Sequence, residues 1–165
     1  MKNFFVKLSL ILLMFAPSDL YSANKPLGEP QAIMAEIGKP GTIVIKVWSY
    51  NKSAKISDEQ VFENAIKCII FKGIESDDSR RMKGRQAMII ETDSGTAEYF
   101  DSFFAKKEYL QYCSMPMEGF VEQGNLLKLK KGYKIGKIVV VQYEQLRKIL
   151  VADGIIRGLA SGFKS

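Results

Sequence analysis

Residues 42–50 read TIVIKVWSY, a run of β-branched and aromatic residues that predicts a β-strand. Side chains alternate between the two faces of a strand. One face of this run carries Ile43, Ile45 and Val47, and the other carries Val44, Lys46 and Trp48. We expect it to be the central strand of a sheet.

The segment after this strand carries the signals of a helix start. Ser57 and Gln60 have the spacing of a capping box, in which the serine hydroxyl accepts a hydrogen bond from a backbone N–H of the first turn. Apolar residues then recur at helical spacing up to Gly73, which is typical of a left-handed C-terminal cap. A helix is therefore predicted over residues 58–72.

The remaining segments alternate between helix and strand signals. They predict, in chain order, a polar loop (74–85), a strand (86–91), a helix (97–113) with Thr96 as N-cap, a short strand (119–121), strands at 126–130 and 133–142, and a helix (143–152) capped by Gly154. Expected to face inward are Phe100, Phe103, Phe104 and Leu110 of the second helix, and Leu127 and Leu129 of strand 126–130.

This order of elements is typical of an α+β domain. We expect a mainly antiparallel sheet of four to five strands, with two or three helices packed on one face. Lysines alternate with apolar residues in the hairpin at 128–137, and this pattern argues against a parallel sheet, because parallel sheets bury both of their faces.

The N-terminus has the pattern of a signal peptide. Lys2 and Lys7 precede the apolar run LSLILLMFA (8–16), which Pro17 ends. Cleavage before Ala23 removes residues 1–22 and lowers the formal charge from +6 to +5. The apolar run is shorter than the roughly 20 residues that span a bilayer. We therefore expect an exported protein without stable membrane insertion, located in the periplasm, at the outer membrane or outside the cell.

The exported part divides into a lead-in and one domain. Residues 23–40 hold three prolines and two glycines, which predicts an extended segment with at most a helical turn around 31–37. Residues 41–165 then form a single α+β domain. Its basic balance favours anionic partners. Anionic glycan, lipid head groups or another protein suit the expected compartment, whereas nucleic acid does not.

Chemistry-bearing motifs are scarce in this sequence. It contains no histidine, which excludes Ser-His-Asp and Cys-His nucleophile arrangements and removes the commonest zinc ligand. We predict no catalytic residue, cofactor or metal site, and a hydrolase using carboxylates or a Ser-Lys pair remains an alternative.

Two sets of surface residues are candidates for binding. The basic residues Arg80, Arg81, Lys83, Arg85, Lys128 and Lys130 are candidates for an anion-binding surface. Edge-strand lysines also discourage sheets from pairing edge to edge, which is the alternative interpretation of Lys128 and Lys130. The aromatic residues Trp48, Tyr50 and Tyr112 are candidates for a protein or glycan contact, with packing inside the fold as the alternative.

Cys68 and Cys113 leave two alternatives open. An oxidising compartment favours a disulfide bond between them. Each also lies among apolar residues of a predicted helix, which fits two separate buried thiols.

Several stretches resemble a group of small exported envelope proteins of Gram-negative bacteria. They are GTIVIKVWSY (41–50), NAIKCIIFKGI (64–74), the pair Phe103 and Phe104, GYKIGKIVVV (132–141) and LRKILVADGIIRGLASGF (146–163). The strand–helix start is also similar to the α+β modules of flagellar assembly protein T and of curli-type secretion lipoproteins. The similarity to these modules implies a non-enzymatic role in envelope assembly or scaffolding. From export and the lack of catalytic motifs, we expect another envelope protein as partner.

Overall fold

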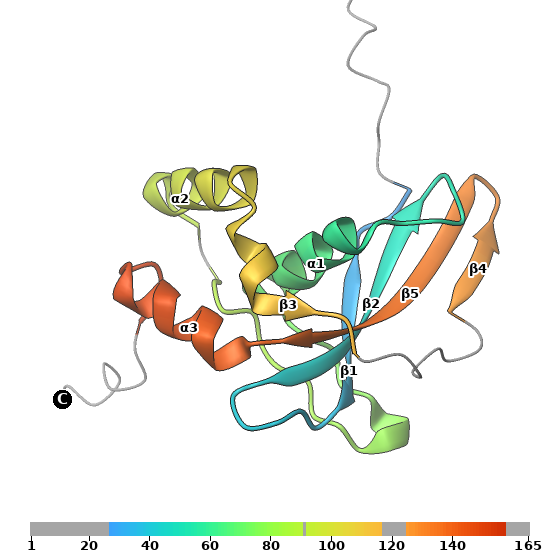
Figure 1. The fold of residues 1–165 in the computed structure, drawn as a ribbon, viewed down its shortest axis with the longest axis horizontal. Helices are drawn as coiled ribbons and strands as arrows, with labels where there is room; N and C mark the ends of the chain where they lie inside the picture. Colours follow the sequence, from blue (N-terminus) through green and yellow to red (C-terminus); the bar gives the residue numbers. More distant parts are fainter. Residues whose placement is uncertain (1–26, 91, 117–124, 158–165) are drawn as a thin grey trace, which may run out of the picture.

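A curled antiparallel sheet of five strands dominates the fold (Figure 1). The computed structural model describes residues 27–90, 92–116 and 125–157. In chain order the strands are β1 (Gln31–Glu36), β2 (Ile43–Asn51), β3 (Cys113–Ser114), β4 (Leu126–Leu129) and β5 (Gly132–Val141). They are arranged β1-β2-β5, with β3 and β4 pairing different parts of the far edge of β5. The α+β class and the antiparallel sheet predicted from the sequence are therefore confirmed.

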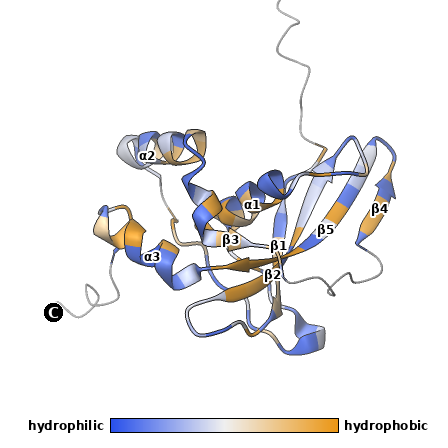
Figure 2. Ribbon diagram, viewed as in Figure 1, coloured by the Kyte–Doolittle hydropathy of each residue, from blue (hydrophilic) through white to orange (hydrophobic). Residues whose placement is uncertain are grey.

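The predicted central strand is confirmed as β2. It pairs with β5 from Ile43 opposite Val141 to Asn51 opposite Tyr133. The face that carries Ile43, Ile45 and Val47 is buried, and Ile45 is 0% exposed. Val139 and Val141 of β5 extend this apolar face, and the half of β5 that leads to the final helix is hydrophobic in Figure 2.

The expected lead-in contains the strand β1, so a helical turn around 31–37 and a core that begins at Gly41 were both wrong. β1 pairs with β2 from Gln31 opposite Trp48 to Glu36 opposite Val44, with an irregularity between Met34 and Glu36. Ala32 and Met34 lie in the hydrophobic core. The alanines, methionine and glutamate of this stretch favour helix, but pairing with β2 and burial of one face override that preference.

The helix predicted at 58–72 is present in two parts. In α1 (Asp58–Lys67), Ser57 Oγ accepts a hydrogen bond from the N–H of Gln60 at 3.3 Å, as the capping box predicts. The chain continues as a π-helical turn, η1 (Cys68–Lys72), which buries Cys68, Ile69 and Ile70 together. It ends at Gly73, where φ is 88° and a Cβ would lie 2.7 Å from the carbonyl oxygen of Arg85.

One buried polar contact joins α1 to the sheet. Asn64 Nδ2 donates to Ser49 Oγ at 2.8 Å, and Ser49 of β2 is 0% exposed. Leaving a buried hydroxyl without a partner costs about 1–3 kcal/mol, so this contact favours the observed position of α1 on β2.

The polar loop at 74–85 is tied back to the sheet. Ile74 bridges Arg85, Asp77 bridges Met82, and Glu75 runs parallel to Ile33 of β1. The short helical turn η2 (Asp78–Arg80) closes its tip.

The strand predicted at 86–91 is absent from the described residues 86–90. The N–H groups of Met88 and Ile89 donate instead to the carbonyl oxygens of Ile69 and Ile70, at 3.1 and 2.9 Å. This segment therefore satisfies carbonyls of the π-helical turn rather than pairing in the sheet.

The predicted second helix is shorter and starts earlier than expected. The N-cap of α2 (Ser94–Ala105) is Asp93, not Thr96, because Asp93 Oδ1 accepts from the N–H of Thr96 at 2.7 Å. Lys107 has a left-handed φ of 57°, and a separate turn, η3 (Glu108–Tyr112), follows. Because of this break, the side chains of residues 108–112 point in other directions than they would in a continuous helix.

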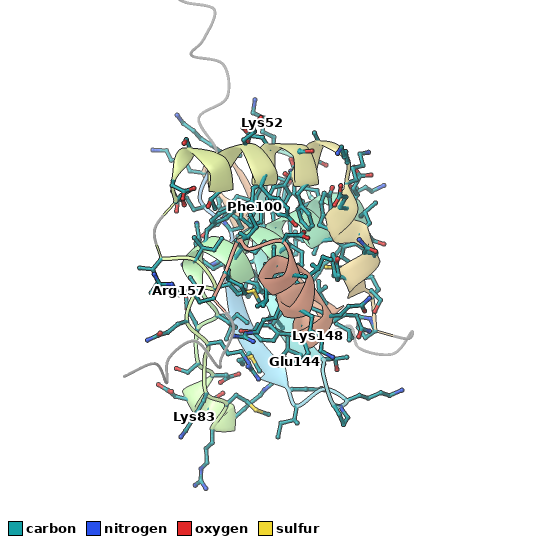
Figure 3. The ribbon with its side chains drawn as sticks, turned by 90° about the vertical axis from the view of Figure 1, so that its left-hand side faces the viewer. Lys52, Lys83, Phe100, Glu144, Lys148 and Arg157 are labelled. Carbon is teal, nitrogen blue, oxygen red and sulfur yellow. The ribbon has the colours of Figure 1, made fainter. Side chains whose placement is uncertain are left out.

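Phe100 and Phe103 are buried as expected, and Phe100 projects from α2 toward the interior in Figure 3. Phe104 is partly buried against the core. Leu110, predicted to face inward, is 37% exposed, and Tyr109 and Tyr112 are buried instead.

The C-terminal elements agree well with the sequence. β5 and α3 (Tyr143–Ala152) have the predicted positions, and Gly154 has a φ of 75°. Leu127 of β4 was expected to face inward but is 47% exposed, because β4 pairs with the end of β5 that lies away from the helices. The strand predicted at 119–121 lies outside the described residues.

Candidate functional site

The sheet has one face in the core and one face outside it. From β1, β2 and β5, the core takes Ala32, Met34, Ile43, Ile45, Val47, Val139 and Val141. Side chains that point to the opposite side are partly exposed and pack outside that core. We call this side the open face, formed by Ile33 of β1, by Val44, Lys46, Trp48 and Tyr50 of β2, and by Lys134, Gly136, Ile138 and Val140 of β5.

Trp48 is the centre of the open face. The Nζ atoms of Lys46 and Lys134 lie 4.8 and 5.0 Å from the centroid of its ring, and Lys134 Nζ is also 5.6 Å from the ring of Tyr50. We call these four residues the lysine–aromatic cluster. Contacts of this kind stabilise exposed sites by about 0.5–1 kcal/mol each. The cluster therefore holds two positive charges beside one indole.

Gly136 makes room for the cluster. It pairs with Trp48 across the two strands. A Cβ at this position would lie 2.9 Å from the indole and 3.0 Å from Lys46 Cε. The indole and the lysine stem therefore rest on bare backbone.

A pocket of about 300 Å³ adjoins the cluster. It is lined by Ile33, Met34 and Ala35 of β1, by Lys46 and Trp48 of β2, and by Ser76, Asp77, Asp78 and Arg80 of the loop at 76–80. Arg80 holds the loop in place, since its Nη1 donates to the carbonyl oxygen of Ala35 at 3.3 Å and its Nε lies 3.6 Å from Asp77 Oδ2. The hydroxyl of Ser79 donates to Asp77, which lowers the pKa of that carboxyl.

The predicted basic residues do not form one surface. Glu75 runs beside β1, so the loop with Arg80, Arg81, Lys83 and Arg85 lies at that edge of the sheet, whereas β4 with Lys128 lies beyond β5 at the opposite edge (Figure 1). Arg85 stacks on the ring of Tyr143 at 4.6 Å. Arg81, Lys83, Lys128 and Lys130 are exposed, and Lys83 lies at one extreme of the molecule in Figure 3.

The predicted aromatic residues have two different environments. Trp48 and Tyr50 lie on the open face and are partly exposed. Tyr112 is 5% exposed and stacks on Phe103 with ring centroids 6.3 Å apart, so it is a core residue and not a surface contact. Lys46 and Lys134 were not among the predicted site residues. Lys46 lies two residues before Trp48, so the sequence already indicated that both side chains share one face of the strand. The position of Lys134 on that face follows only from the register between β2 and β5.

Both cysteines are free thiols in the structure. Burial raises the pKa of Cys68 to about 11 and that of Cys113 to about 12. A neutral, buried thiol is a poor nucleophile, because the thiolate is the reactive form.

The described residues hold neither a metal-ligand cluster nor a membrane-spanning helix. In residues 27–90, 92–116 and 125–157, no three His, Cys, Asp or Glu side chains come together as a metal site would need. Across the same ranges, no helix has the length and apolar composition that a membrane span requires.

Comparisons of the chain with protein-family models, with curated proteins and with solved structures gave no match. The functional proposal below rests on the open face.

Burial of the cysteines predicts slow reaction with a thiol reagent. In the folded protein at pH 8, both thiols are expected to react far more slowly than free cysteine, because Cys68 is buried, Cys113 is partly buried and both are protonated. After denaturation without reductant, a colorimetric assay should count two thiols per chain, and one in the Cys68→Ala variant. Rapid labelling of the folded protein would contradict the burial, and a count of zero would demonstrate a disulfide bond.

The contact over Gly136 predicts a local effect of adding one methyl group. In Gly136→Ala, the new Cβ should displace the indole of Trp48, the single tryptophan of the chain, and shift its fluorescence emission to longer wavelength. The free energy of unfolding should change by less than about 1.5 kcal/mol, because the displaced atoms lie outside the core. Gly95→Ala is the matched control, since a Cβ there approaches no side chain but that of Asp93, at 3.7 Å. An unchanged emission spectrum in Gly136→Ala would contradict the packing.

Proposed function

We propose that this chain is an exported, non-enzymatic interaction module, and that its open face binds another protein of the cell envelope. The observation that carries the proposal is the position of Trp48, partly exposed at the centre of a sheet face that lies outside the core. Tryptophan, tyrosine and arginine dominate the binding energy of protein interfaces, and such residues cluster near the interface centre. Trp48 and Tyr50, with the pocket and its Arg80 beside them, match that composition.

Rigidity of the open face supports the proposal. Its residues stand on β2 and β5, which pair over nine consecutive positions, and the inner face of both strands is packed into the core. A surface that is ordered before binding avoids the entropy cost of ordering a loop. The aromatic side chains are therefore presented in one arrangement to a partner.

The support for export to the envelope comes from the sequence. The charged start at Lys2 and Lys7, the apolar run at 8–16 and the small residues before Ala23 favour a cleaved signal peptide. The similarity to the α+β modules of flagellar assembly protein T and of curli-type secretion lipoproteins favours a role in assembly or maintenance of an envelope structure. Periplasm, outer membrane and cell surface are all compatible with the proposal.

Binding of anionic glycan or lipid head groups is the second candidate. The observation in its favour is the pair of ammonium groups beside Trp48, because both lie on the same face. Against it, the two basic segments at 80–85 and 128–130 lie at opposite edges of the sheet and do not add to that charge. The apolar residues Ile33, Val44, Ile138 and Val140 around the cluster suit a protein surface better than a glycan.

Site-specific photo-crosslinking tests the proposal. A crosslinking phenylalanine analogue replaces Tyr50 on the open face or Glu98 on the exposed side of α2, and intact cells that express the full chain are irradiated. We expect one adduct of defined mass from position 50 and none from position 98. The second substitution Trp48→Glu should reduce that adduct at least about ten-fold, as loss of a tryptophan hot spot implies.

Circular dichroism and thermal unfolding show whether the Trp48→Glu variant keeps its fold. An equal adduct from both positions, an adduct that survives Trp48→Glu in the folded variant, or no adduct at all would contradict the proposal.

A further inference from the structure

The pocket at the edge of the open face restricts the chemistry of the partner. Resting on the proposed function, we infer that the partner inserts one uncharged aromatic side chain into this pocket, between Trp48 and the loop at 76–80. This side chain is the anchor of the interface, and the rest of the open face contacts the segment that carries it.

The pocket is continuous with the open face. Ile33, Lys46 and Trp48 belong to the open face and also line the pocket. A segment that lies on the sheet beside Trp48 can therefore direct one side chain into the pocket without leaving the face. Anchor residues of protein interfaces typically fill pockets of this kind.

An irregularity of β1 shapes the pocket. Between Met34 and Glu36 the register with β2 shifts by one residue, which leaves Ala35 as an extra residue in β1. A bulge of this kind bends a strand and re-aims its groups. The carbonyl oxygen of Ala35 accepts a hydrogen bond from Arg80 Nη1 at 3.3 Å, and the N–H of Met34 donates to the carbonyl oxygen of Glu75 at 3.0 Å. Both ends of the loop at 76–80 are thus attached to β1, so the pocket exists before a partner binds.

The volume of the pocket, about 300 Å³, suits one aromatic side chain. An apolar cavity of about 150 Å³ binds benzene, whereas pockets for drug-sized molecules have volumes of about 300 to about 1,000 Å³. The pocket therefore has room for a phenylalanine or tryptophan side chain and lies at the lower limit for a free ligand. Aromatic rings also pack favourably on one another in edge-to-face and offset arrangements, and the indole of Trp48 lines the pocket.

The charges around the pocket favour an uncharged occupant. Lys46 and Arg80 contribute two positive charges to its lining, and Asp77 and Asp78 contribute two negative charges, so the formal charges cancel. The positive groups also have contacts within the chain. Lys46 Nζ lies 4.8 Å from the centroid of the Trp48 ring, and Arg80 Nε lies 3.6 Å from Asp77 Oδ2. An ionised side chain in the pocket would lose hydration and meet no surplus of opposite charge, which disfavours it.

Synthetic peptides with one variable residue test this inference. The probe has nine residues, with phenylalanine at the centre, serine or threonine elsewhere, and both ends blocked so that it carries no charge. It contains no tryptophan, so the emission of Trp48 in the full chain reports binding at the pocket. We expect a saturable change in emission. Alanine, glutamate or lysine at the centre should each weaken binding at least about ten-fold, because they remove the aromatic anchor or add a charge that the pocket does not compensate.

Matched variants assign the binding to the pocket. Ser76 is exposed and lines the pocket, so Ser76→Phe should fill it and weaken binding of the phenylalanine peptide at least about ten-fold. Ser94→Phe makes the same substitution at an exposed position of α2 and should leave binding unchanged. Circular dichroism checks that both variants keep the fold. Equal affinity for the four peptides, or equal loss in both variants, would overturn the inference.

A third variant tests the charge balance. Asp78→Asn leaves one surplus positive charge in the lining of the pocket. It should raise the affinity for the glutamate peptide at least about three-fold and leave that for the phenylalanine peptide unchanged. An unchanged affinity for the glutamate peptide would contradict the argument that cancelling charges select an uncharged side chain.

Two other outcomes separate the inference from the proposed function. If position 50 forms its crosslinked adduct while the phenylalanine peptide fails to bind, the aromatic anchor is overturned and the protein-binding role stands. If no adduct forms and benzyl alcohol binds as tightly as the peptide, with the same loss in Ser76→Phe, both the anchor and the protein partner are overturned in favour of a small aromatic molecule.

Discussion

The pairing of β2 with β5 is the constraint on which the rest of the structure depends. Antiparallel register runs from Ile43 opposite Val141 to Asn51 opposite Tyr133. A slip of one residue would turn every side chain of one strand to the other face. The register therefore decides two things at once. It gathers the valines and isoleucines that α1 covers, and it brings Lys134 and Gly136 beside Trp48 on the opposite side.

Elements with strong local signals were predicted from the sequence. The central strand, the capped start of α1, β5 and α3 depend on alternation, capping and helical periodicity within one segment. β1 and the segment at 86–90 could not be predicted in this way, because hydrogen bonds to β2 and to the carbonyls of Ile69 and Ile70 decide their conformation. The end of α2 was not predicted, because Lys107 adopts a left-handed conformation that is uncommon for lysine and has no signal in the sequence.

The candidate site was predicted only in part, for the same reason. Trp48 and Tyr50 stood out as aromatic residues of a strand with two different faces. Tyr112 is not a surface contact, because the break at Lys107 directs its side chain into the core. The two lysines of the cluster come from strands that are far apart in the sequence, and only the register shows that they share one indole. A surface built from long-range pairing is invisible to patterns that are read along the chain.

The open face presents an indole that solvent reaches in part and that has the ammonium groups of two lysines beside it. Quenching of the fluorescence of Trp48 by small ions measures both properties in the folded chain, and no second tryptophan contributes to the signal. Iodide should quench more strongly than caesium at equal concentration and ionic strength, since the ammonium groups of Lys46 and Lys134 attract the anion and repel the cation. Protection from both ions, or stronger quenching by caesium, would contradict the open, positively charged face.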